Sequence, residues 1–565
     1  MKKEHNWSLA KKAPKSFFNQ FPEFSPIVLQ LFYNRGLKAE IDIENFLSPD
    51  YEQSLFDPFL MNDMKKAVER IKKAISKKEN IVIYGDYDAD GITSVACLYE
   101  VLKLLGAKNL SYYIPDKNKE GYGLNNQALL ELAKQKTNLI ITVDCGITSI
   151  DEISLAKSKK IDVIITDHHI VPEKLPKAFA ILNPKQKKDK YPFPDLAGEG
   201  VAFKLAQALL KTKDNKHEAT LKWMMDIIGL GTIADVVPLI SENRVFAKYG
   251  MVVLKKTKNL GLMALMAKSK VNPDKLNTSS ISFQIIPRLN VAGRMDHAFA
   301  SLKLLLTNSY KEAEKISENL NDLNIRRQKM IEQILKEARE EIGVFDWERK
   351  ILVLSNKDWS NAVLGLVAGR LSDEYNRPVF MIEEGKEESK GSARSIESFN
   401  ISEALQKCKK YLIKFGGHKQ AAGFSLKTKD IEQFENSLCK IGNKQIKKEN
   451  IVPKISADCE IKLSDISWEL MEELEKFEPY GEANFMPNFL IKNLDILETK
   501  NIGNGEKHLR LFLTDGQKSI KAIGFGLAHD SLEIGYKVDV IANLDINEWN
   551  GTKNIEIKLV DFKVK

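Results

Sequence analysis

Between residues 80 and 240, short apolar runs alternate with segments of helical pattern, and this alternation constrains the fold more than any other feature of the chain. The apolar runs cover residues 81–86, 110–116, 138–144 and 161–167. The helical patterns lie near residues 93–105, 125–135 and 148–159. Such alternation predicts a parallel sheet with helices on both faces. In sheets of this kind, ligands bind at the carboxyl ends of the strands.

Three carboxylates follow the first apolar run directly. Asp86, Asp88 and Asp90 alternate in the segment IVIYGDYDADGITS, which carries no basic residue. Carboxylates this close repel one another, and placing one such ion in a low-dielectric site without a partner costs several kcal/mol. A divalent cation is the simplest partner for all three. The cluster therefore predicts a metal enzyme.

Further acids and two histidines fall at the ends of later strands or in adjoining loops. Asp144 ends the run 138–144, while Asp167, His168 and His169 follow the next run, and Asp235 lies in GLGTIADVVPL. Taken alone, each has an ordinary explanation, such as a helix cap, a surface loop or a satisfied buried acid. Their joint occurrence in one α/β unit favours a single shared site.

The chemistry of these side chains indicates which metal they would hold. Carboxylates and imidazoles without a thiolate suit Mn²⁺ or Mg²⁺ better than a structural zinc. Two ions about 3.5–4 Å apart, sharing a bridging carboxylate, would bind a phosphoryl oxygen and lower the pKa of a water between them. We therefore expect two Mn²⁺ or Mg²⁺ ions and phosphoester hydrolysis.

Composition limits the class of protein. A length of 565 residues suggests three or four domains. No stretch approaches the roughly 20 apolar residues that a membrane span needs, and the N-terminus has no apolar signal core. Five scattered cysteines without a CxxC pair argue against a disulfide framework and fit a reducing cytoplasm. A net charge of +8 is compatible with a polyanionic partner without indicating one.

The pattern beyond the first sheet suggests further domains. A long, charged, proline-free segment predicts a connector helix, a second α/β pattern begins at KILVLSN (350–356), and short alternating strands near the end predict a small barrel or sandwich. The predicted parts are a helical lead-in (1–75), a parallel-sheet catalytic domain (76–307), the connector helix (308–345), a second α/β domain (346–445) and the C-terminal β-barrel (453–565).

These motifs, in this order, resemble a known family. GDYDADG, VDCG, TDHH and GTIADVVPL are similar to the successive motifs of the DHH phosphoesterases, and their spacing resembles the RecJ branch of single-strand-specific DNA exonucleases. RGLKAEIDIENFLSPD resembles the lead-in of that branch, and PRLNVAGRM resembles its arginine motif. GSARS and GGHKQAAGFS resemble motifs of the DHH-associated domain, and the C-terminal barrel resembles an OB-fold. The resemblance covers nearly the whole chain.

The resemblance implies a role for each residue of the acidic site. Asp144 would bridge the two ions, Asp167 would orient a ligating histidine, and His169 would contact the scissile phosphate or assist the leaving group. The implied metal ligands are Asp86, Asp88, Asp90, Asp144, His168 and Asp235. Some relatives carry a histidine two residues before the first acid, where this chain has Tyr84. A neutral tyrosine is a poor ligand, so the resemblance implies a less tightly held ion.

Single-stranded DNA is the implied substrate, with phosphate contacts from basic side chains and free backbone amides. The candidates for contact with DNA phosphate are Lys117, Arg288, Asn290, Arg294, Ser392, Arg394, Gly417 and His418. The resemblance places recognition of a 5′-phosphate at GSARS. GGHKQAAGF combines a flexible glycine pair with His418; its ordinary alternative is a helix N-terminus after a turn, which could also bind phosphate. Tyr122 is explained equally well as a base-stacking residue and as an ordinary packed tyrosine.

The barrel would hold the single strand in a groove lined with basic and aromatic residues. Its aromatic candidates are Phe485, Phe489, Phe512, Phe525 and Trp549, each of which a core position would also explain. The resemblance further implies a helicase and a single-strand-binding protein as partners.

Three functions compete. The leading one is a two-metal 5′→3′ exonuclease on single-stranded DNA, acting in DNA repair and recombination, with its polarity implied by the resemblance. A DHH-type phosphodiesterase on short oligonucleotides or cyclic dinucleotides is the alternative, although such substrates need no extra strand-holding domain. A non-enzymatic scaffold would have lost its acids, and here every acid and both histidines are present.

Overall fold

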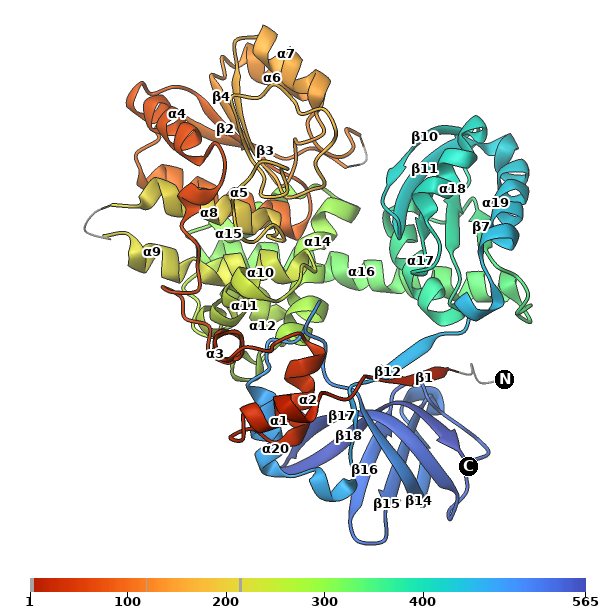
Figure 1. Cartoon of the computed structure of the whole chain (residues 1–565). Coiled ribbons are helices and arrows are strands. Elements are labelled where there is room, and N and C mark those ends of the chain that lie inside the picture. Colours follow the sequence, from red (N-terminus) through yellow and green to blue (C-terminus); the bar gives the residue numbers. More distant parts are fainter. Residues whose placement is uncertain (1–4, 118, 213–215) are drawn as a thin grey trace. The chain divides into compact units, whose positions relative to one another are not determined.

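The computed structural model describes residues 5–117, 119–212 and 216–565, and these form two compact units (Figure 1). The larger unit comprises Leu9–Asn321 and Ser456–Lys565. The smaller unit comprises Met1–Ser8 and Asp322–Ile455. Among the described residues, no helix combines the length and apolar character needed to cross a membrane.

The larger unit contains a five-stranded parallel sheet, as the alternating pattern predicts. Its strand order is β3-β2-β4-β5-β6, and every neighbouring pair is parallel. The strands are β2 (Ile81–Tyr84), β3 (Leu110–Tyr113), β4 (Leu139–Val143), β5 (Asp162–Thr166) and β6 (Ala180–Leu182). The first four end one to three residues earlier than the apolar runs suggest. Their terminal acids therefore lie in the loops that leave the sheet.

Helices cover both faces of this sheet (Figure 1). On one face, apolar side chains of the strands pack with α6 (Asn126–Lys134) and α7 (Ile150–Ser158) in one buried cluster. On the other face lie α5 (Ala89–Leu104) and α8 (Gly198–Leu210), which also contact each other. The strands β2, β4 and β6 are consequently buried along their whole length, and β5 in all but its first residue, whereas the edge strand β3 is partly exposed.

A helical half, which the sequence pattern did not reveal, follows the sheet. Its helix α10 packs against both α5 and α8, so it continues the layer beneath the sheet. The helices of this half are α9 (Glu218–Trp223), α10 (Met225–Ala234), α11 (Ser241–Leu254), α12 (Leu260–Lys268), α14 (Ile286–Met295) and α15 (Phe299–Leu306). A π-helical turn (Ile281–Ile285) leads into α14.

The C-terminal strands of the larger unit close into a barrel, as expected for an OB-fold. The order β14-β15-β16-β18-β17 is closed by pairing of β17 with β14. The strands are β14 (Phe489–Ile502), β15 (His508–Thr514), β16 (Ser519–Gly524), β17 (Lys537–Trp549) and β18 (Thr552–Val564). Of the candidate aromatics, Phe489 is buried, whereas Phe485 and Phe525 are 63% and 64% exposed. The side chain of Trp549 lies outside the described residues.

The N-terminal helices share the barrel's core. They are α1 (Lys15–Gln20), α2 (Pro26–Asn34) and α3 (Glu40–Leu47), whereas the next helix, α4 (Met64–Ser76), packs on α8 and β6. The ring of Phe32 in α2 stacks on Phe477 at 5.1 Å, and Phe46 in α3 meets the same ring edge-on at 5.4 Å. Residues from both ends of the chain thus form one apolar cluster.

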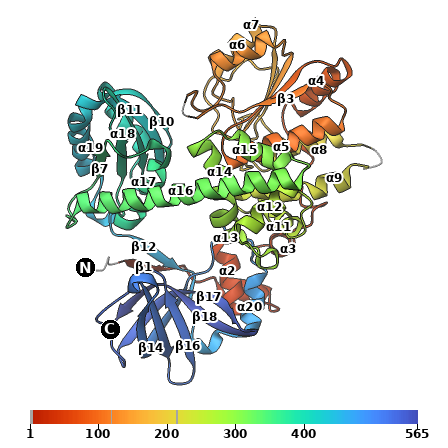
Figure 2. The same ribbon diagram turned by 180° about the vertical axis from the view of Figure 1, so that it is seen from behind.

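The predicted connector is a single helix of 33 residues, α16 (Tyr310–Ile342), visible along its length in Figure 2. Beyond it, the smaller unit has a mixed sheet of order β10-β11-β9-β8-β7. Its strands are β7 (Leu352–Asn356), β8 (Val379–Glu383), β9 (Glu388–Arg394), β10 (Leu412–Gly417) and β11 (Ala421–Lys427). Its helices are α17 (Asn361–Tyr375), α18 (Ile401–Lys407) and α19 (Ile431–Gln445). This unit is the expected second α/β domain.

Candidate metal centre

The loop after β2 brings three acids to the carboxyl edge of the sheet. Asp86 and Asp90 are 3% and 1% exposed. Asp88 caps α5, because its Oδ1 accepts a hydrogen bond from the Gly91 amide at 3.1 Å. A Cβ on Gly91 would lie 2.7 Å from the Asp86 carbonyl oxygen. The loop therefore turns this tightly only with glycine at position 91.

The N-terminus of α8 holds Asp90 in place. The Gly198 amide donates to Asp90 Oδ2 and the Glu199 amide to Asp90 Oδ1, both at 2.8 Å. A Cβ on Gly198 would stand 2.7 Å from Asp144 Oδ1, so glycine leaves the room that both carboxylates occupy. Sequence reasoning missed this contribution, since its only signal is the glycine pair in AGEGVAF.

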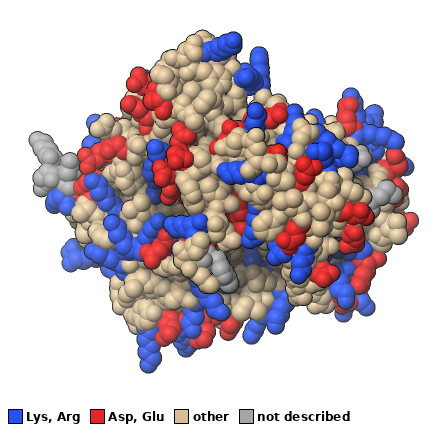
Figure 3. Space-filling model, turned by 90° about the horizontal axis from the view of Figure 1, so that it is seen from below, with Lys and Arg blue, Asp and Glu red and all other residues tan. Residues whose placement is uncertain are grey.

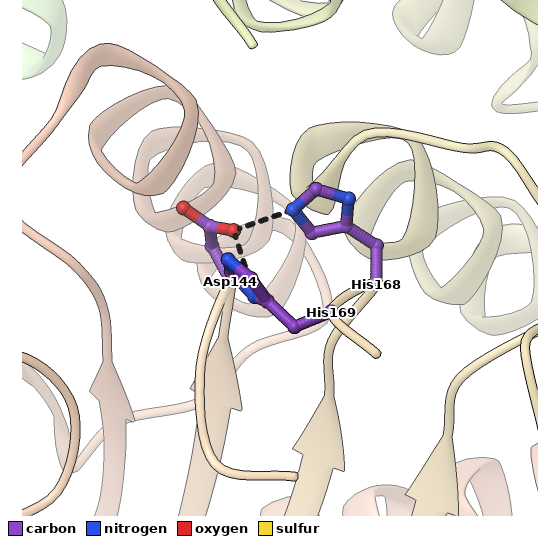
Figure 4. Close-up of side chains that lie close together, drawn as sticks. All are labelled: Asp144, His168 and His169. Carbon is purple, nitrogen blue, oxygen red and sulfur yellow. Dashed lines mark ion pairs between the residues drawn. The ribbon is translucent and has the colours of Figure 1, made fainter. Parts of the chain in front are cut away.

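Asp144 is the acid that lies close to both histidines of the site. It follows β4 with a φ of 58°, a left-handed conformation that is uncommon for a residue with a side chain. Its Oδ1 lies 3.1 Å from His168 Nε2 and 3.9 Å from His169 Nδ1. Figure 4 shows both imidazoles, carried by the loop after β5, facing the same carboxylate oxygen.

His168 also connects the sheet to the helical half. Its Nδ1 lies 3.5 Å from Oδ2 of Asp235, the residue that ends α10. Its Nε2 lies 4.0 Å from Oδ2 of Asp90. Side chains separated by more than 140 positions in the sequence are thus brought to one point.

Asp167 orients His169 rather than facing the other acids. Its Oδ1 accepts hydrogen bonds from His169 Nδ1 at 2.7 Å and from the backbone amides of His168 and His169. Its Oδ2 accepts from the Ile147 amide at 2.9 Å. Burial alone would raise the pKa of Asp167, but His169 and these amides together lower it below its ordinary value. Asp167 thus holds the side chain of His169, which is not among the expected metal ligands, and reaches the expected ligand His168 only through its backbone amide.

Three overlapping groups of side chains place their ligand atoms within 4.8 Å of one another. They are Asp86, Asp88 and Asp144; Asp90, His168 and Asp235; and Asp144, His168 and His169. Asp144 and His168 each belong to two groups. Asp86 Oδ1, Asp144 Oδ1 and both nitrogens of His168 are buried and make no hydrogen bond within the described part of the chain. Buried ligand atoms left without a hydrogen bond fit a bound cation.

The pKa values of the site are also consistent with a bound cation. Burial, followed by repulsion from neighbouring carboxylates, raises the pKa of Asp86, Asp90 and Asp144 well above the usual range. Burial and the charge of Asp88 raise the pKa of Asp235 to about 7. Burial and the nearby His169 lower the pKa of His168 to about 3, so its imidazole is neutral near pH 7. A neutral imidazole is the form that binds a metal.

The arginine motif packs against the acidic loop. Asn290 Oδ1 accepts a hydrogen bond from the Ala89 amide at 2.7 Å, and a Cβ on Gly293 would lie 2.5 Å from the Tyr87 carbonyl oxygen. The Oδ1 of Asn290, a predicted DNA contact, therefore holds the loop. Arg294 is in the electrostatic field of Asp88. Arg288 Nε donates to Asn321 Oδ1 at 3.1 Å.

Lys117 also lies close to the acidic loop, since its Nζ is 5.2 Å from the centre of the Tyr87 ring. Elsewhere on the surface, Lys and Arg side chains are intermingled with Asp and Glu over the face in Figure 3. Charge alone therefore marks no path for a nucleic acid on that face.

The remaining predicted residues lie in the smaller unit. Ser392 and Arg394 are on β9, and a Cβ on Gly365 of α17 would lie 2.9 Å from Ser392 Oγ and 3.1 Å from Arg394 Nη2. Gly417 ends β10, and the His418 amide donates to the Ala421 carbonyl at 2.8 Å. The alternative of a helix N-terminus at GGHK is wrong, because Gly416 and Gly417 end β10 and His418 begins the turn into the antiparallel strand β11.

Comparison with protein families supports the same organisation. The DHH family, N-terminal domain, matches residues 80–232, the DHHA1 domain matches 348–444, and the RecJ OB domain matches 457–561. Each match falls within the corresponding predicted domain.

Individual proteins are similar over nearly the full chain. The single-stranded-DNA-specific exonuclease RecJ of Bacillus subtilis is 37% identical over 96% of this chain and 68% of its own length. RecJ of Haemophilus influenzae is 31% identical over 95% of this chain and 96% of its own length. The crystal structure of RecJ from Thermus thermophilus in complex with Mn²⁺ superposes with a TM-score of 0.84 at 28% identity, covering 99% of this chain and 79% of that one. A complex of the Thermus protein with Mg²⁺ gives a TM-score of 0.79 at 27% identity, covering 99% and 78%.

Proposed function

The chain belongs to the RecJ family of single-stranded-DNA-specific exonucleases, and from this premise we propose that it removes nucleotides from single-stranded DNA in the 5′→3′ direction. It is a metal-dependent exodeoxyribonuclease, and its membership of the family is consistent with a role in DNA repair. The observation that carries the proposed chemistry is the cluster of acids around Asp144, in which Asp86 Oδ1, Asp144 Oδ1 and both nitrogens of His168 are buried without a hydrogen bond in the described part of the chain.

We propose two ions in this cluster, because its ligand groups overlap at Asp144 and His168. Asp86, Asp88 and Asp144 would hold one Mn²⁺ or Mg²⁺, and Asp90, His168, Asp235 and Asp144 the other. When bound, the ions supply positive charge that binds a phosphoryl oxygen and lowers the pKa of a water. Asp144 would be shared by the two ions, since its carboxylate is grouped with Asp86 and Asp88 and its Oδ1 lies 3.1 Å from His168 Nε2 of the other set.

His169 has the properties of a group that acts on the phosphate. Burial opposes its protonation, but the hydrogen bond and the charge of Asp167 raise its pKa above the ordinary value. Because Nδ1 faces Asp167, Nε2 remains the ring nitrogen available to the substrate. An imidazolium held in this way can donate a hydrogen bond to the scissile phosphate or a proton to the leaving oxygen.

We assign the contacts with the DNA phosphates to residues in both units. In the larger unit, we propose Lys117, Arg288 and Arg294, with Asn290 acting mainly by holding the acidic loop. In the smaller unit, we propose that Ser392, Arg394, Gly417 and His418 recognise the terminal 5′-phosphate. The compact packing of Ser392 and Arg394 against Gly365 supports this assignment.

The test is digestion of end-labelled single strands with and without a 5′-phosphate, in Mn²⁺ and in Mg²⁺. We expect mononucleotide release from the 5′ end, no digestion of a blunt duplex, and faster turnover of the phosphorylated strand. Release from the 3′ end would overturn the polarity. Turnover of a dinucleotide but not of a long strand would overturn the substrate class in favour of a short-oligonucleotide phosphodiesterase.

Cellular context follows from the same proposal. We place the protein in the cytoplasm, since its five cysteines are free thiols that a reducing compartment preserves. A helicase that supplies single strands and a single-strand-binding protein that coats them are the proposed partners. Pull-down of each purified partner with the full-length chain tests both.

A further inference from the structure

Tyr84 lies at the end of β2, two residues before Asp86. A histidine at this position could act as a metal ligand. Its side chain is fully buried, and its ring stacks on Tyr113 at 5.0 Å. The hydroxyl donates to the Gly123 carbonyl at 3.1 Å and accepts from Asn125 Nδ2 at 3.2 Å. The phenol is therefore directed into the segment 119–125, which we call the 119–125 loop.

A second set of hydrogen bonds fixes the same loop through Glu120. Its Oε1 accepts from the Tyr113 hydroxyl at 2.6 Å and from Asn125 Nδ2 at 3.0 Å. Its Oε2 accepts from the Asp116 amide at 2.7 Å. Tyr84, Tyr113, Glu120 and Asn125 thus form one connected network between the ends of two strands and the loop.

The loop places Tyr122 against the catalytic groups. The Tyr122 hydroxyl donates to the Asp144 carbonyl at 2.9 Å, and its oxygen lies 3.2 Å from Nδ1 and 3.4 Å from Nε2 of His169. Gly121 and Gly123, on either side, have φ values of 85° and 78°. A tyrosine between two left-handed glycines has little local restraint, so its position depends on what holds the loop.

We propose that Tyr84 is a positioning residue that acts on the reaction through the 119–125 loop, and not on the metal. Its hydroxyl holds Gly123 and Asn125, the loop then holds Tyr122, and Tyr122 fixes the backbone of Asp144 and one side of the His169 ring. The proposal deepens the proposed function, on which it rests. A shorter side chain without a hydroxyl at position 84 would not make the hydrogen bonds to Gly123 and Asn125.

The test is Tyr84→Phe, which removes only the hydroxyl and keeps the ring that packs on Tyr113. We expect kcat to fall about tenfold, equivalent to about 1.4 kcal/mol, with the Mn²⁺ concentration for half-maximal activity unchanged. Tyr249→Phe is the matched control, because the Tyr249 hydroxyl also donates to a backbone carbonyl, that of Pro49 at 3.3 Å. The control is expected to retain full activity.

Two further measurements separate a local role from a general loss of stability. Hydrogen exchange of the amides of the 119–125 loop, measured without metal, should be faster in Tyr84→Phe and unchanged in Tyr249→Phe. Combining Tyr84→Phe with Tyr122→Phe should lower kcat little more than the larger single effect, because both act through one contact. Additive losses would overturn the proposal.

Tyr84→His distinguishes the loop from the metal. If the side chain acts through the loop, this variant behaves like Tyr84→Phe, with a faster-exchanging loop and the same Mn²⁺ requirement. A lower Mn²⁺ requirement with unchanged loop exchange would overturn the proposal. Loop exchange needs no nuclease activity, so failure of the proposed function would be seen separately from failure of this inference.

Discussion

Two groups of buried charge lie in the larger unit, and they differ in where their partners come from. Lys204 Nζ and Glu242 Oε1 are 2.8 Å apart with both side chains fully buried, and Glu242 also accepts from the Tyr191 hydroxyl at 2.6 Å and the Phe56 amide at 3.0 Å. Every charge there has a partner in the chain. Among the acids around Asp144, Asp86, Asp90 and Asp144 itself are almost as deeply buried, yet the ligand atoms of the cluster face one another.

The difference separates a structural use of charge from a binding use. A buried ion pair stabilises only if its geometry and hydrogen bonds offset the cost of desolvation, and the Lys204–Glu242 pair meets that condition within the fold. The acidic cluster does not meet it, so the charges of the cluster need bound metal ions to balance them. Removing one member should therefore destroy catalysis in the cluster and stability in the ion pair.

The largest expected effect is on activity, in Asp144→Ala. Loss of the side chain shared by two ligand groups should lower nuclease activity by several powers of ten, each worth about 1.4 kcal/mol. Binding of single-stranded DNA, measured by fluorescence anisotropy, should largely persist. Asp226→Asn, a change at another buried acid of the same unit, is the control and should remain active. Full activity of Asp144→Ala would rule out the two-metal mechanism.

The next effect is on stability, in Glu242→Gln. This change leaves Lys204 buried without its counter-charge, which should cost about 3–5 kcal/mol in the free energy of unfolding measured with urea. The activity of the folded fraction should be close to normal. Replacing both residues by apolar side chains should recover much of the loss, and a double variant no more stable than Glu242→Gln would contradict the assignment.

Adding Mn²⁺ should have a smaller effect on stability. At a hundred times its dissociation constant, a single bound ion stabilises the folded state by about 2.7 kcal/mol. We expect the melting temperature of the wild type to rise when Mn²⁺ replaces EDTA. The rise should be much smaller in Asp144→Ala and unchanged in Glu242→Gln relative to the metal-free form of each variant. An equal rise in all three would place the stabilising ion elsewhere.

The smallest effect concerns Asp226, a buried carboxyl with only neutral partners. Burial raises its pKa from 3.8 to about 6, although Thr257 and the Ile227 amide oppose the shift. Because the folded pKa is the higher one, its contribution to stability is present below pH 4 and is lost as pH rises through 6. Asp226→Asn should therefore gain on the order of 2 kcal/mol over the wild type between pH 4 and pH 8. A gain independent of pH would show that Asp226 does not ionise in this range.

Much of this could be predicted from the sequence. The strands that precede Asp86, Asp144 and Asp167 could be predicted because apolar runs of strand length stop at a polar residue. Their convergence follows from the parallel sheet alone. The long helix was equally legible, since it is charged and free of proline.

Other features depend on contacts that no local pattern encodes. The amides of Gly198 and Glu199 bind Asp90 through backbone atoms, which leave almost no trace in the side chains. The role of Asn290 toward Ala89 and the direction of the Tyr84 hydroxyl depend on which segments meet in space. The alternative of a helix at GGHK was wrong because a glycine pair occurs in hairpins as readily as before helices.

The stacking of Phe32 on Phe477 has a consequence for how the protein is made. A ribosome releases α2 hundreds of residues before the barrel strands exist, so the apolar face of the first helices stays uncovered for most of synthesis. Contacts of such long sequence separation form late and leave nascent chains open to aggregation. The N-terminal helices should accordingly be the part of the newborn chain that a chaperone shields until the last strand emerges.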